Sequence, residues 1–121
     1  MIVNCTPHVV DVYGAAAPNT VTDADRPYMS IAPSGEVARL AEQVMHDGQP
    51  THHRGAEAAE VFVVEYGHVV GLPPVRDGVW HVVSLPLALA VPSRPDLLVP
   101  YRQVRNERGT VVGCRGFARP C

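Results

Sequence analysis

The stretch from Val79 to Pro100 constrains the fold most, because a strand-like run, a helix-like run and a second strand-like run follow one another there. Ser84 ends the first apolar run, and Pro86 stands where proline is tolerated in a first helical turn. Pro92 stops the helix, and the second apolar run begins at Leu97. The segment therefore predicts a short β-α-β-like unit.

The remaining apolar runs predict strands. The run 2–13 is broken at Thr6-Pro7, because proline has no N–H to donate to a central ladder. Residues 37–45 fit either a helical face or a strand, and we favour the strand. Residues 47–59 predict a long hairpin connection rich in turn formers, and residues 116–121 a frayed tail. The predicted strands are 2–13, 28–31, 37–45, 60–71, 79–84, 97–99 and the hairpin 103–114.

The totals fit a small globular chain. At 121 residues it predicts one domain, 1–121, and no apolar run approaches the roughly 20 residues that span a bilayer. The beginning of the sequence resembles no signal peptide, and three cysteines are too few for a disulfide framework, so we expect a cytoplasmic protein. We predict a strand-dominated α+β fold with a mixed sheet and one short crossover helix.

Charge divides the chain unevenly. Residues 94–121 carry six arginines against two acidic residues, whereas residues 1–93 carry four arginines against ten. Such an asymmetry can mark a surface that faces an anion, and the alternative is that the arginines of the tail are simply solvated. The net charge of −2 and the low aromatic content argue against a dedicated nucleic-acid binder.

One set of polar residues lies at predicted strand ends, turns and the helix start. In an open α/β sheet such positions gather in one crevice, where a serine and arginines suit phosphate or carboxylate. The set is Asn4, Thr6, His8, Ser84, Arg94, Asp96 and Arg105.

The same residues also have a purely structural interpretation. Asn4 and Thr6 would satisfy the backbone around Thr6-Pro7, Ser84 would only cap the helix, and Arg94 would pair with Asp96 to close a loop. The sequence leaves both interpretations open.

His8 is the candidate general acid or base, with Ser84 or Cys5 as the group it would activate. Metal binding has weak candidates in Cys5, His8, His52 and His53, but no second ligand pair stands at finger or ribbon spacing. We therefore expect no metal and no other cofactor.

Short motifs spread over nearly the whole chain form a recognisable pattern. They are Asn4 to His8, Ile31 to Gly35, Val37 to Arg39, Tyr66-Gly67, Gly71 to Pro73, Trp80 to Ser84, Arg94 with Asp96, and Arg105 to Gly109 with Gly113-Cys114. By these motifs the chain resembles a family of small uncharacterised proteins found in tailed-phage, prophage and actinobacterial genomes. The resemblance implies a shared fold and polar cluster, with no assigned reaction, and it favours the strand at 37–45. This chain departs from the family in an enlarged 42–59 insertion and in Pro86.

These observations predict a protein that binds a small anionic, nucleotide-like molecule. The alternatives are a small hydrolase or transferase that uses His8, and a phage or biosynthetic accessory protein that acts by protein–protein interaction. Convergence of His8, Ser84 and Arg94 on one cavity would favour a ligand or an enzyme, and their scatter would favour the interaction protein. Unpaired strands in a small sheet also predict a homodimer.

Overall fold

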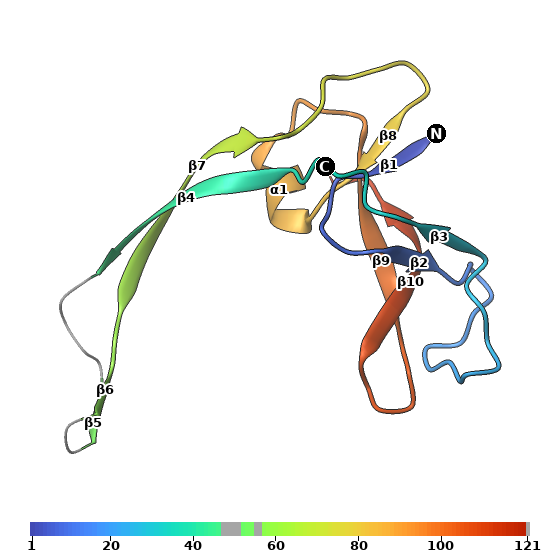
Figure 1. The fold of residues 1–121 in the computed structure, drawn as a ribbon, viewed down its shortest axis with the longest axis horizontal. Helices are drawn as coiled ribbons and strands as arrows, with labels where there is room; N and C mark the ends of the chain where they lie inside the picture. The colour runs from blue at the N-terminus through green and yellow to red at the C-terminus, as the bar shows by residue number, and fades with distance from the viewer. Residues whose placement is uncertain (47–51, 55–56, 121) are drawn as a thin grey trace.

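A computed structural model describes residues 1–46, 52–54 and 57–120, and within these ranges it contains ten strands and one helix. Figure 1 shows their arrangement. The elements are β1 (Ile2–Asn4), β2 (Val10–Val12), β3 (Met29–Ile31), β4 (Arg39–His46), β5 (His52–Arg54), β6 (Glu57–Ala59), β7 (Phe62–Val70), β8 (Trp80–Val82), α1 (Leu85–Ala90), β9 (Leu97–Arg105) and β10 (Val111–Ala118).

The body of the protein is a six-stranded sheet with the order β1-β8-β9-β10-β2-β3. The sheet is mixed, since β8 lies parallel to both β1 and β9 whereas β9 and β10 are antiparallel. The prediction of a strand-dominated chain with a mixed sheet and one short helix is confirmed. Because the helix has only six residues, the chain is mostly β, and the label α+β describes it loosely.

The segment that the sequence singled out forms the predicted unit. Strands β8 and β9 are parallel, with His81 opposite Leu97, and α1 crosses between them. Leu87 of α1 is fully buried beside Val83 and Val99. An apolar helix of one and a half turns has little stability of its own, so this packing holds it.

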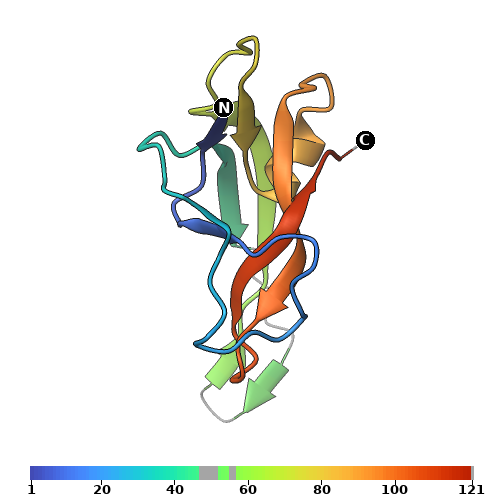
Figure 2. The same ribbon diagram turned by 90° about the vertical axis from the view of Figure 1, so that its right-hand side faces the viewer.

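The break at Thr6-Pro7 divides the first apolar run into two strands, which occupy different positions in the sheet. Strand β1 pairs with β8, whereas β2 lies between β10 and β3. The prediction of a frayed tail from Gly116 is wrong, because β10 continues to Ala118. It does so because β9 is one continuous strand, and its residues Val99 and Tyr101 pair with β10. Figure 2 shows β9 and β10 as one long hairpin.

Strands β4 and β7 form a separate antiparallel ribbon, which we call the arm. The strand predicted at 37–45 is confirmed as β4. A bulge interrupts β7, because three residue steps from Tyr66 to Val69 oppose two from Glu42 to Leu40. At its root the arm packs Leu40 and Val69 against the core. Beyond the root, Figure 1 shows the arm running away from the body.

The connection predicted at 47–59 is partly strand. Residues 52–54 and 57–59 pair as β5 and β6, an antiparallel ribbon of three residues each. The sequence did not predict this pairing, because the stretch is rich in turn formers and its apolar and polar residues do not alternate as in a strand. No helix in the described ranges is long and apolar enough to cross a membrane.

Candidate functional site

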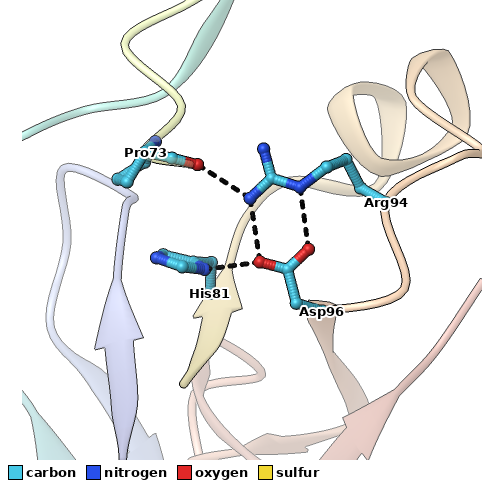
Figure 3. A network of polar contacts seen from close by, with 4 residues as sticks. All are labelled: Pro73, His81, Arg94 and Asp96. Carbon is cyan, nitrogen blue, oxygen red and sulfur yellow. Dashed lines mark hydrogen bonds and ion pairs between the residues drawn. The ribbon is translucent and has the colours of Figure 1, made fainter. Parts of the chain in front are cut away.

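The most constrained polar contacts lie at the amino ends of β8 and β9. Asp96, which is 6% exposed, accepts hydrogen bonds from Nε and Nη2 of Arg94, each at 2.8 Å. His81 Nδ1 lies 2.8 Å from the same carboxylate, and Arg94 Nη2 also donates to the carbonyl oxygen of Pro73 at 2.7 Å. Figure 3 shows this network of four residues. An ionised carboxylate only accepts hydrogen bonds, so Nδ1 of His81 carries the proton.

Electrostatics keeps the network ionised. The pKa of Asp96 is lowered to about 2, chiefly because Arg94 donates two hydrogen bonds to the carboxylate, with His81 adding a third. The pKa of Arg94 is raised, because its side chain is hydrogen-bonded to Asp96. The pair therefore stays charged at neutral pH, and the guanidinium is held in one orientation.

Two cavities of about 290 and 250 Å³ lie beside this network and share Pro95 and Arg119 in their walls. Trp80 lines the first and Arg94 the second. The guanidinium of Arg119 stands over the Trp80 ring, 5.5 Å from its centre. We call the two cavities together the Trp80 groove. Its walls can stack a planar ring and face an anion.

A larger cavity of about 400 Å³ lies elsewhere, between Val21 to Asp23 and the β9–β10 turn. Its charged lining consists of Asp23, Glu107 and Arg108. Two carboxylates against one guanidinium disfavour an anion there, so volume alone does not identify the predicted site.

The structure gathers Asn4, Thr6 and His8 in the turn after β1. Asn4 donates to the carbonyl oxygens of His8 and Ile31 at 2.7 and 2.9 Å and accepts from the Thr6 hydroxyl at 2.6 Å. Asn4 is 1% exposed, whereas the His8 side chain is exposed. These contacts satisfy backbone groups around Pro7, as the structural interpretation expected.

Ser84 and Arg94 do not meet, which corrects the expectation that they share one point. Ser84 follows the carboxyl end of β8, whereas Arg94 precedes the amino end of β9, and the two strands are parallel. A crossover helix returns the chain to the opposite edge of the sheet, so the two residues flank the strands at opposite ends. Ser84 occupies the N-cap position, but its side chain makes no capping hydrogen bond.

Arg105 lies apart from both groups, at the far end of β9. Its guanidinium donates to the carbonyl oxygen of Gly109 at 2.7 Å and to Gln103 at 3.3 Å, so it braces the β9–β10 turn. The predicted set is thus divided among separate places, and only Arg94 and Asp96 border the Trp80 groove.

The described residues provide neither a reactive thiol at Cys5 nor a group of metal ligands. Cys5 is fully buried, and burial raises the pKa of its thiol, so it stays protonated and is a poor nucleophile. Within the described ranges no group of three histidine, cysteine or acidic side chains is placed to hold a metal ion. The side chains of His52 and His53 lie outside the described residues.

Sequence reasoning missed Trp80, Arg119 and His81 as parts of one site. The proximity of Trp80 and Asp96 could have been predicted from the β-α-β unit. Its two strands are parallel, so their amino ends lie at the same edge of the sheet. Arg119 was missed because residues 116–121 were expected to form a frayed tail, which would place no side chain in a site. Comparisons with protein-family models, curated proteins and solved structures found no match to this chain. The resemblance to the phage and actinobacterial family stays a prediction.

Proposed function

We propose that the protein acts by protein–protein interaction and that the arm is its docking element. The observation that carries this proposal is an exposed apolar pair on the described part of the arm. Val44 and Val64 are directly opposite each other and are 51% and 41% exposed. Residues directly opposite in an antiparallel pair lie on the same face of the ribbon, so the two valines form one apolar surface.

This surface costs free energy while it faces water. A two-stranded ribbon without a covering layer is marginally stable in water, and contiguous exposed apolar surface is typical of interaction sites. Burying a valine side chain completely contributes roughly 1.5–3 kcal/mol. Docking Val44 and Val64 would therefore stabilise the arm together with the complex.

The partner that fits the arm is a second copy of this chain, because the charges are complementary. The two strands of the arm carry Glu42 and Glu65 against one arginine, Arg39. The β9–β10 hairpin, residues 97–118, carries four arginines against one glutamate and exposes Tyr101 and Val111. Opposite charges on facing surfaces steer association and fix its geometry.

Reciprocal docking closes the assembly. If the arm of each copy lies on the hairpin of the other, the two contacts are related by a two-fold axis and no free site remains. The scatter of His8, Ser84 and Arg94 favours an interaction protein over an enzyme that uses His8. The expected homodimer is thereby given a specific contact.

The oligomeric state tests this proposal directly. Sedimentation equilibrium over a concentration series should give a dimer for the parent chain. Replacing Val44 and Val64 by serine should weaken association by more than tenfold, because each lost valine contact is worth more than 1 kcal/mol. Val63 is 43% exposed on the opposite face of β7, so Val63→Ser is the matched control and should remain dimeric.

Charge reversal tests the acceptor surface. Glu42→Arg, on the same face of the arm as Val44, should weaken the dimer, as should Arg102→Glu with Arg108→Glu on the hairpin. Combining the arm and hairpin changes in one chain should restore association, since the two surfaces are again of opposite sign. A monomeric parent at every concentration would overturn the proposal. A dimer whose affinity is unchanged by either reversal would exclude the hairpin as the acceptor.

A further inference from the structure

The Trp80 groove lies on the body of the protein, at the edge of the sheet where β8 and β9 begin and β10 ends. The antiparallel pairing of Ala118 with Val99 brings the residue after β10 to this edge. Arg119 thereby reaches the Trp80 ring from a strand more than thirty residues away in sequence. The groove is thus built by tertiary pairing and is separate from the arm.

The buried carboxylate below the groove does not repel an anion. Both oxygens of Asp96 are occupied by Arg94 and His81, and the charge of Arg94 cancels that of Asp96. The remaining charges on the walls are those of Arg76, Arg119 and Asp77. The groove therefore has a net positive charge on a chain whose net charge is −2.

Two groups in the groove are positioned for different parts of a ligand. Trp80 is 36% exposed, and the guanidinium of Arg119 stands over its ring, so a ligand ring that stacks there takes the place of Arg119. Arg94 lines the adjoining cavity, and its third nitrogen, Nη1, takes no part in the network drawn in Figure 3. A rigidly held guanidinium with a donor to spare is suited to an oxyanion.

We propose that the Trp80 groove binds a planar aromatic anion of the nucleoside monophosphate type. The aromatic ring takes the place of Arg119 on the Trp80 face, and the phosphate accepts hydrogen bonds from the displaced Arg119 and from Nη1 of Arg94. Stacking on an aromatic side chain tolerates every base, so this arrangement selects the class of ligand more than its identity. The proposed ligand is of the anionic class that the sequence predicted. Its site uses Trp80 and Arg119, however, where the sequence predicted Ser84 and His8.

Trp80 is the only tryptophan in the chain, so its fluorescence reports on the groove alone. Titration with adenosine monophosphate, excited at the red edge of tryptophan absorption, should quench this fluorescence to a saturating value. Adenosine should quench with at least tenfold weaker affinity, because it lacks the charged phosphate. Inorganic phosphate should compete with the nucleotide yet quench little by itself, because it has no ring to stack.

Variants separate the two contacts. Arg119→Ala should weaken nucleotide binding by about tenfold or more, because the phosphate keeps only its contact with Arg94. Arg26→Ala is the matched control, because Arg26 is an exposed loop arginine and the change removes the same charge. Trp80→Leu, followed by calorimetry, should abolish binding of both ligands. Absence of saturable quenching in the parent would overturn the proposal, as would equal affinities of the parent and Arg119→Ala.

Discussion

The buried ion pair of Asp96 predicts a large and pH-dependent effect of Asp96→Asn. The carboxylate accepts three side-chain hydrogen bonds, two from Arg94 and one from His81. The amide of asparagine keeps one acceptor oxygen and turns a donor toward the other donors, and Arg94 loses its counter-charge. Removing one partner of a buried pair costs about 3–5 kcal/mol, and since Arg94 is 16% exposed we expect about 3 kcal/mol.

The sign of the pH dependence follows from the pKa of Asp96, which is about 2 in the folded chain and lies below its ordinary value of 3.8. A lowered folded pKa contributes stability above the unfolded pKa, and that stability is lost as pH falls toward 2. The shift corresponds to about 2 kcal/mol at neutral pH, of which about 1 kcal/mol is gone by pH 3. The difference between parent and Asp96→Asn should therefore narrow on acidification.

Urea unfolding at pH 7 and pH 3, followed by Trp80 fluorescence, measures both quantities. A loss of about 3 kcal/mol lowers the midpoint by about 2 M urea for a chain of this size. Asp23→Asn is the control, because Asp23 is exposed and distant from the network, and it should change the midpoint little. A difference under about 1 kcal/mol at pH 7, or one that widens at pH 3, would refute the reasoning.

A double-mutant cycle assigns the effect to the pair. Arg94→Leu alone leaves a buried carboxylate without its main partner, so it should destabilise the chain by a similar amount. The double variant should cost clearly less than the sum of the two single changes, since neither then leaves an unpaired charge. Additive costs would show that Arg94 and Asp96 act separately.

Three further predictions concern packing. Gly113→Ala should destabilise the chain by about 1–3 kcal/mol in chemical unfolding, because its Cβ would lie 2.5 Å from a backbone oxygen, whereas Gly116→Ala, which has open space, should be near neutral. Leu87→Ala should lower stability by about 2–5 kcal/mol, and Leu89→Ala, on the exposed side of α1, by less than about 0.5 kcal/mol. The Cys5 thiol, whose pKa burial raises, should react with a thiol reagent at pH 8 only after unfolding; rapid labelling of Cys5 itself in the native chain, located by peptide mapping, would contradict its burial.

The local elements were predictable where short-range chemistry decides them. The break at Pro7 follows from a missing backbone donor, and Gly109 takes the positive φ of 80° that the β9–β10 turn requires. The unit from β8 to β9 was also predictable, because an apolar helix between two apolar strands has one common arrangement. Continuity of β9 through Tyr101 was not, since only pairing with β10 holds its exposed residues in a strand.

The site depended on pairings that no local pattern contains. The sequence indicated that Arg94 and Asp96 are two residues apart and of opposite charge, which suffices to predict their ion pair. It could not indicate which edge of the sheet they occupy, and therefore misplaced Ser84 beside them. Arg119 meets Trp80 only because β10 runs antiparallel to β9 as far as Ala118.

The sequence by itself determined the composition of the elements: strands from β-branched runs, one short helix after Ser84, and turns at glycine and proline. The tertiary structure alone decided that the arm leaves the body with its valines exposed, and that the polar residues divide between opposite ends of the sheet. The physical reason is that a β-strand forms neither its backbone hydrogen bonds nor its apolar packing with residues close to it in sequence. Its hydrogen bonds and its apolar face are completed by partners distant in sequence, and those partners decide what remains at the surface.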